Sequence, residues 1–283
     1  MEQEKIIAYK GFDKDFKCRG FQYEVGKEYE EDGAICCEKG FHACENPIDV
    51  WGYYDILDSR FAIVEQYDII DKEDNKTCSS KIKIKAELKF ADFVKLCVDA
   101  VVDKCKLNSK NDNGGDSARI GSSGNYAQIG SSGYSAQIGS SGDYAQIGSS
   151  GDCARIGSSG NDAQIGSSGD CARIGSSGYS AQIGSSGDCA QIGSSGNDAQ
   201  IKSEGQGAVI MCAGTNSKAR AKKGSWITLA EYDDNRKPVC VKTEQVDGER
   251  IKEDTWYQLI DGEFKEVNYK NGSCKVYLPI TNE

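Results

Sequence analysis

A nine-residue repeat fills the middle of the chain and constrains its fold more than any other feature. From Asp116 the unit Gly-Ser-Ser-Gly-x-x-Ala-Gln/Arg-Ile recurs, and a fixed period of this kind is typical of a stacked architecture. Alternation places Ala and Ile on one face of a short strand and Gln or Arg on the other. We expect the glycines to supply the positive-φ turns at Gly-Ser-Ser-Gly corners. Because nine residues are too few for a helical hairpin, the repeat predicts a β-solenoid.

A second period of 18 residues indicates that two units form one coil, so the solenoid has two flat faces. Variant residues recur at separations of 18 or 36: arginine at Arg119, Arg155 and Arg173, cysteine at Cys153, Cys171 and Cys189, and tyrosine at Tyr126 and Tyr144. The parity of the strand predicts that the cysteine side chains point outward. We expect them to be free, partly exposed thiols, with the neighbouring arginines favouring the thiolate in two of them.

The segments on either side of the repeats are predicted to cap the solenoid, giving a mainly β fold in three domains. These are an α+β N-terminal cap (1–115), the nonapeptide-repeat solenoid (116–214) and a C-terminal β-strand cap (215–283). The last strands predict a meander with hairpin turns at Asp247-Gly248 and Asp261-Gly262. The expected strands are Lys5–Tyr9, Arg60–Gln66, Ser80–Leu88, Trp226–Tyr232, Val239–Val246, Thr255–Ile260 and Glu263–Val267, with helical turns at Pro47–Leu57 and Leu88–Lys104.

Charge and composition narrow the function classes. The formal net charge of −10 argues against direct binding to a nucleic-acid backbone. No apolar run approaches the ~18 residues of a membrane-spanning helix, and Met1–Lys10 lacks the apolar core of an export signal. The 13 cysteines are an odd number with no disulfide-framework spacing, which favours free thiols in a reducing compartment. These features predict a cytoplasmic protein with no membrane partner.

The N-terminal motifs resemble an uncharacterised family of phage and bacterial proteins of unknown function. The residues that carry the resemblance are Ala8-Tyr9-Lys10-Gly11-Phe12, Cys18-Arg19-Gly20-Phe21, Gly26-Lys27-x-Tyr29, Gly40-Phe41-His42-Ala43-Cys44 and Tyr53-Tyr54. The resemblance implies an N-terminal α+β cap followed by Gly-Ser-rich repeats and a phage or bacterial origin, and it brings no activity. The repeat tract is also similar to the head repeats of trimeric autotransporter adhesins.

The spacing of the aspartate, cysteine and histidine residues gives little support for a metal site or a nucleophilic catalytic site. Calcium-binding nonapeptide rolls need an aspartate at one fixed point in nearly every unit, and tyrosines interrupt that series here. Cys36, Cys37, His42 and Cys44 offer zinc-ligating atoms, but not in paired CxxC knuckles. His42 and Cys44 share a strand face, which is compatible with a dyad without indicating one. We therefore predict no catalytic residue, no metal site and no cofactor.

The function predicted from the sequence is non-catalytic binding of a macromolecular, protein partner through a flat solenoid face. The best aromatic and polar patch comprises Tyr126, Gln128, Tyr144 and Gln146, since tyrosine is favoured at interface hot spots. One alternative is an acidic nucleic-acid mimic that inhibits a host defence enzyme. Another is an enzyme in the N-terminal cap, such as an ADP-ribosyltransferase-like fold, which Tyr9-Lys10-Gly11 faintly resembles. The oligomeric state is left open.

Overall fold

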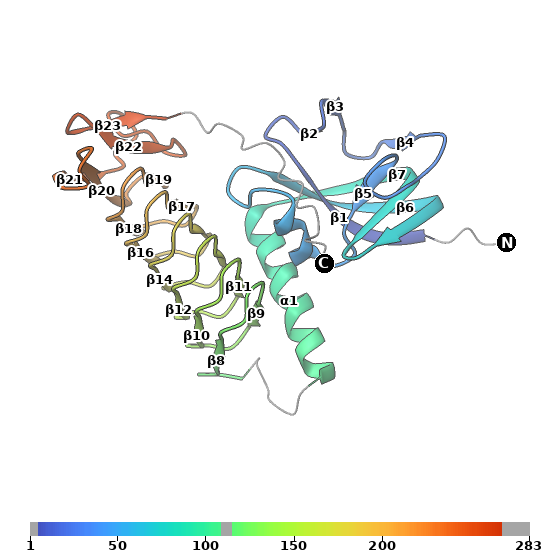
Figure 1. The fold of residues 1–283 in the computed structure, drawn as a ribbon, viewed down its shortest axis with the longest axis horizontal. Helices are drawn as coiled ribbons and strands as arrows, with labels where there is room; N and C mark the ends of the chain where they lie inside the picture. Colours follow the sequence, from blue (N-terminus) through green and yellow to red (C-terminus); the bar gives the residue numbers. More distant parts are fainter. Residues whose placement is uncertain (1–4, 109–114, 268–283) are drawn as a thin grey trace. The chain divides into compact units, whose positions relative to one another are not determined.

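The computed structural model describes residues 5–108 and 115–267, which form two compact units. The first unit extends to Lys89 and the second begins at Phe90 (Figure 1). No helix in the described ranges is long and apolar enough to cross a membrane.

The first unit is built on an antiparallel sheet with the order β1-β6-β7-β4, and β5 also pairs with β7. Aromatic residues fill its core, where the rings of Phe12 and Phe16 stack with centroids 4.2 Å apart. The elements are β1 (Lys5–Phe12), β2 (Lys17–Cys18), β3 (Phe21–Gln22), β4 (Glu28–Glu30), β5 (Phe41–Ala43), the 3-10 helix η1 (Pro47–Gly52), β6 (Arg60–Glu73) and β7 (Lys76–Leu88). The long strands contain all three segments predicted as strands in this part of the chain.

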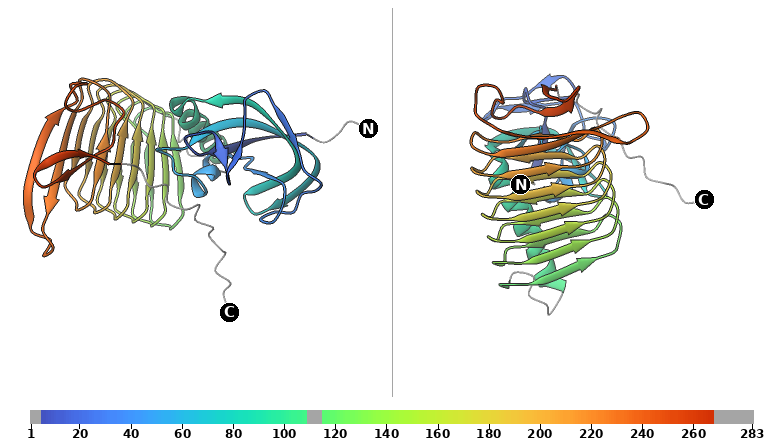
Figure 2. Two further views of the ribbon diagram at one scale, coloured as in Figure 1. Left: turned by 90° about the horizontal axis from the view of Figure 1, so that it is seen from above. Right: turned by 90° about the vertical axis from the view of Figure 1, so that its left-hand side faces the viewer.

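The second unit contains the β-solenoid, whose about six turns span residues 119–229. Each strand pairs in parallel with the strand 18 residues away, as Ile147 pairs with Ile165, which confirms the two-unit coil and its two flat faces (Figure 2). The first sheet contains β8 (Arg119–Ser122), β10 (Gln137–Ser140), β12 (Arg155–Ser158), β14 (Arg173–Ser176), β16 (Gln191–Ser194) and β18 (Val209–Cys212). The second contains β9 (Gln128–Ser131), β11 (Gln146–Ser149), β13 (Gln164–Ser167), β15 (Gln182–Ser185), β17 (Gln200–Ser203) and β19 (Lys218–Arg220).

Each strand from β8 to β16 has the sequence Gln/Arg-Ile-Gly-Ser, with the Ile and Ser side chains inside. The first Gly-Ser of the predicted corner therefore belongs to the strand, and the turn comprises the following Ser-Gly-x-x. In the coil around β11, Ala145, Ile147 and Ser149 are each fully buried, whereas Gln146 faces outward. The core is consequently a thin layer of stacked isoleucine, alanine and serine.

The prediction that glycine supplies the positive φ of each corner is wrong. The left-handed residue is the one before Ala, such as Cys153 (φ 59°), and the corner glycines of the uniform repeats do not have this conformation. The corner glycines are needed instead because successive coils stack backbone on backbone. A Cβ atom on Gly151 would lie 2.0 Å from the carbonyl oxygen of Gly133 in the preceding coil.

Helix α1 (Phe90–Asn108) belongs to the second unit, whereas the sequence assigned 1–115 to the N-terminal domain. It packs on the outer surface of β9, β11 and β13 (Figure 1). Its side chains Phe93, Val94, Cys97 and Val98 are fully buried. The helix therefore covers one of the two solenoid sheets.

Two hairpins close the C-terminal end of the solenoid, one on each sheet. Strand β20 (Trp226–Tyr232) extends the first sheet and pairs with β21 (Pro238–Gln245), while β22 (Tyr257–Ile260) extends the second and pairs with β23 (Glu263–Glu266). A hairpin turn is present at Asp261-Gly262, as predicted, but not at Asp247-Gly248, where the chain crosses from one sheet to the other. Val246, Ile251, Tyr257 and Leu259 join the isoleucine core and seal its end.

Candidate functional site

The residues predicted as a binding patch lie in two different places. Tyr126 and Tyr144 occupy the left-handed corner position, with φ of 59° and 58°, and their rings stack with centroids 5.0 Å apart. Gln128 and Gln146 lie on the adjoining strands, where the Nε2 group of Gln128 donates a hydrogen bond to Oε1 of Gln146 at 3.2 Å. The tyrosines thus form a corner ladder and are not part of a flat sheet face.

The sheet that carries these glutamines is the one that α1 covers. Val98 and Val101 of the helix lie over the strand glycines Gly148 and Gly130. A Cβ atom on Gly148 would be 2.7 Å from Cγ2 of Val98, and one on Gly130 would be 3.0 Å from Val101. The glycines of this sheet therefore allow the helix to pack closely on it. Much of the sheet face that the sequence predicted as a binding surface is consequently covered by α1.

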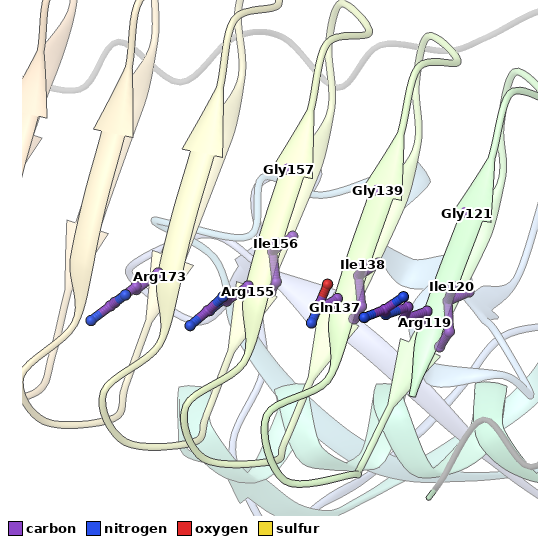
Figure 3. Close-up of a pocket in the computed structure, with 10 residues that line it drawn as sticks. All are labelled: Arg119, Ile120, Gly121, Gln137, Ile138, Gly139, Arg155, Ile156, Gly157 and Arg173. Atoms are coloured by element: carbon purple, nitrogen blue, oxygen red, sulfur yellow. The ribbon is translucent and has the colours of Figure 1, made fainter. Parts of the chain in front are cut away.

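The opposite sheet is built from the same repeat, but the described residues of its unit leave its outer surface open. Gly121, Gly139 and Gly157 form a side-chain-free row along it, and a Cβ atom on any of them would meet nothing within 4 Å. Beside this row lies a shallow hollow of about 650 Å³. Figure 3 shows the glycines and arginines of this hollow on successive strands.

Three exposed arginines run along the open sheet beside the glycine row. Arg119, Arg155 and Arg173 occupy the position that is glutamine in strands β9, β11, β13, β15 and β17 of the covered sheet. Arg155 and Arg173 lie one coil apart and extend in parallel (Figure 3). No ion pair joins any of the three to another residue in the described part of the chain. The open sheet therefore presents a row of positive charge on a protein that is acidic overall.

Apolar side chains continue these rows at the C-terminal end of the open sheet. Val209 and then Trp226 follow the arginine and glutamine row in register, and Met211 follows the glycine row. Met211 is 54% exposed and Trp226 46%. On the neighbouring strand, Val239 and Val241 are also exposed. Sequence reasoning missed this cluster because these residues lie where the repeat decays, and only the strand register brings them together.

The cysteine ladder lies at the corners of the open sheet's coils. Cys153, Cys171 and Cys189 are free thiols in the left-handed corner position, half-buried in the first case and exposed in the other two. Their outward direction follows from the turn and not from strand parity as predicted. The expected thiolate character is contradicted at Cys171, because desolvation and the neighbouring thiols raise its pKa.

In the N-terminal unit, the Tyr-Lys-Gly motif makes packing contacts. Lys10 is only 3% exposed, and its Nζ donates to the carbonyl of His42 at 2.8 Å and lies 3.6 Å from the sulfur of Cys18. The sulfur of Cys18 in turn lies 3.1 Å from the hydroxyl of Tyr54. Gly11 is required because a Cβ atom there would lie 2.3 Å from the Tyr54 ring. This cluster joins β1, β2 and β5.

Two of the candidate zinc ligands of this unit, Cys37 and His42, are joined by a hydrogen bond. The backbone N–H of Cys37 donates to Nε2 of His42 at 2.9 Å, and the ammonium of Lys76 lies 3.0 Å from the Cys37 sulfur. Burial and the positive charges of Lys10 and Arg19 lower the pKa of His42, which keeps its imidazole neutral at pH 7. Within the described residues, no three histidine, cysteine or acidic side chains are grouped to hold an ion.

Comparison with known protein families gives a match in the N-terminal part of the chain. Residues 6–96 match a domain of unknown function, DUF7666. That match covers the first sheet and the beginning of α1, and it leaves the solenoid outside. No curated protein and no solved structure matched the chain.

Proposed function

We propose that this chain is a non-catalytic binding protein that receives a macromolecular partner on the open sheet of its solenoid. The observation that carries the proposal is the contrast between the two sheets. They share one repeat and one geometry, yet one is covered by α1 and the other offers an uncovered glycine row beside arginines. Flat solenoid surfaces suit large, shallow contacts.

The composition of the open sheet supports this role. Arginine, tryptophan and methionine are enriched at protein interfaces. Here Arg155 and Arg173, Trp226 and Met211 are exposed on one continuous sheet surface. An exposed apolar cluster rimmed by charge is typical of an interaction site. The open sheet, and not the tyrosine ladder, is therefore the proposed interface.

The acidic character of the solenoid resides at its corners, where the carboxylates have structural partners. Oδ1 of Asp152 accepts the backbone N–H of Asp170 at 2.9 Å, and Oδ1 of Asp170 accepts that of Asp188 at 2.8 Å. These side chains form turns that repeat from coil to coil. This arrangement favours a protein that receives a partner on its arginine row over one that imitates a nucleic acid.

The repeat itself supplies well-matched variants for a test. Arg155→Gln with Arg173→Gln introduces the residue that occupies the same position in neighbouring coils, so the fold should be retained. Tyr126→Ser with Tyr144→Ser is the control, because Ser180 already occupies that corner position and the change adds no charge. Each protein would be used to capture partners from a bacterial extract, with identification by mass spectrometry.

We expect the arginine variant to lose a partner that the wild type and the tyrosine variant both retain. Circular dichroism and thermal melting would verify that all three proteins are folded. Loss of the partner from the tyrosine variant alone would return the interface to the corner ladder and refute the proposal.

A further inference from the structure

We propose that the occupant of the open sheet is an α-helix of a partner protein, with small apolar side chains over the glycine row and carboxylates facing the arginine row. This inference rests on the proposed function and specifies its partner. Helix α1 is an example of such packing within the chain, because it covers the equivalent surface of the other sheet.

The packing of α1 shows that helix and coil spacings match. Val98 lies over Gly148 and Val101 over Gly130, so three helical residues correspond to one coil. Three residues of an α-helix rise about 4.5 Å, and neighbouring strands are about 4.8 Å apart. The helix runs on toward the later strands of the sheet, since the ammonium of Lys202, three coils beyond Gly148, lies 4.9 Å from the centroid of the Phe90 ring. A helix running across the strands can therefore place a side chain on each successive glycine.

The glycines of the open sheet have the same coil-to-coil spacing, but no helix among the described residues of the unit packs on them. Its glycine row runs over five strands, from Gly121 to Gly193, with Gly139, Gly157 and Gly175 between them. Four coil spacings of about 4.8 Å match roughly 13 residues of helix at about 1.5 Å each. None of these five glycines has an atom within 4 Å of an added Cβ. No contact among the described residues of the unit requires glycine at these five positions. A row without side chains leaves room for a helix of another protein to pack on the sheet.

The charge of the neighbouring row distinguishes the partner helix from α1. Beside the covered glycines lie only glutamines, whereas the open row contains Arg119, Arg155 and Arg173. Carboxylates spaced three or four residues apart on a helix lie about one coil apart, so they can reach Arg155 and Arg173 together. At the C-terminal end of the sheet, the exposed side chains of Met211 and Trp226 would pack against an apolar end of the helix. The partner is therefore an acidic amphipathic helix with an apolar terminus.

Two synthetic peptides test this inference on the full-length protein, in which α1 already covers its own sheet. The first has the sequence of residues 90–108 with alanine at both cysteines. The second also carries Lys95→Glu, Lys104→Glu and Lys106→Glu, which makes it strongly acidic. Binding is followed by Trp226 fluorescence, with Trp226→Phe as the control for signal origin, and by the increase in peptide helicity.

We expect the acidic peptide to bind more tightly than the native-sequence peptide, with weaker binding as salt rises. Arg155→Gln with Arg173→Gln should weaken its binding about 3- to 10-fold, since two partly exposed ion pairs are lost. Gly157→Gln should weaken both peptides by obstructing the glycine row. Tyr126→Ser with Tyr144→Ser, which leaves the charge of the protein unchanged, should leave the affinity unchanged.

Different results would overturn different parts of this inference. Equal affinity of both peptides would overturn the charge complementarity. The absence of saturable binding up to about 1 mM peptide would overturn the helix, while arginine-dependent capture of another partner from extracts would leave the proposed function standing. Arginine-dependent binding of a 20-nucleotide oligothymidylate in place of the peptides would assign the sheet to nucleic acid.

Discussion

Alanine substitutions at Gly148 and Gly157 should have opposite effects on stability, although the two glycines hold equivalent positions in the repeat. Gly148→Ala places a methyl group 2.7 Å from Cγ2 of Val98, well inside van der Waals contact. Valine is stiff about χ1, so it cannot rotate away cheaply. Overpacking of this kind costs about 1–3 kcal/mol, and we expect Gly148→Ala to destabilise the solenoid by that amount.

Gly157 occupies the same strand position on the open sheet, where an added Cβ meets nothing within 4 Å. Alanine there loses less conformational entropy on folding than glycine, so Gly157→Ala should be stabilising by about 0.4–1 kcal/mol. Gly151→Ala is the opposite extreme, because its Cβ would lie 2.0 Å from a backbone oxygen of the preceding coil. That contact can be relieved only by separating the stacked coils, so this variant should fail to form a native solenoid.

Urea denaturation followed by circular dichroism measures all three variants. A double-mutant cycle supplies the control: Val98→Ala removes the clashing methyl groups, so it should be less destabilising in the Gly148→Ala background than in the wild type. Equal free energies of unfolding for Gly148→Ala and Gly157→Ala would refute the helix register described above.

Three further predictions concern the cores of the two units. Ile165→Asp buries a carboxylate in the fully buried isoleucine layer and should unfold the solenoid, at a cost of several kcal/mol; an unchanged melting temperature would contradict the core assignment. Ser167→Ala should be stabilising by about 1 kcal/mol, since no described residue hydrogen-bonds its buried hydroxyl, and a lower urea midpoint would speak against this. The pKa of His42 is lowered in the folded state, so protonation favours unfolding and the N-terminal unit should lose stability as the pH falls below about 6.5. His42→Asn should remove that part of the pH dependence of the melting temperature, and identical pH profiles would exclude it.

The sequence was sufficient for those features that depend on periodicity alone. The 18-residue recurrence of Arg155 and Arg173 predicts the coil and the parallel register, because only side chains that meet the same neighbours in every coil recur at that interval. The segment Trp226–Tyr232 was predicted with its observed bounds, since the change from glycine-rich units to alternating apolar residues is local.

Tertiary structure decided the features that depend on stacking. The corner glycines are required by contacts between coils and not by their own φ angles, which no single repeat reveals. The two sheets are nearly identical in sequence, so only the position of α1 shows that Gly148 is covered and Gly157 is open. Helix α1 covers the sheet of Gln128 and Gln146, which leaves the sheet of Arg155 as the candidate site. A repeat gives both sheets of a solenoid the same geometry, and packing against the rest of the unit makes them different.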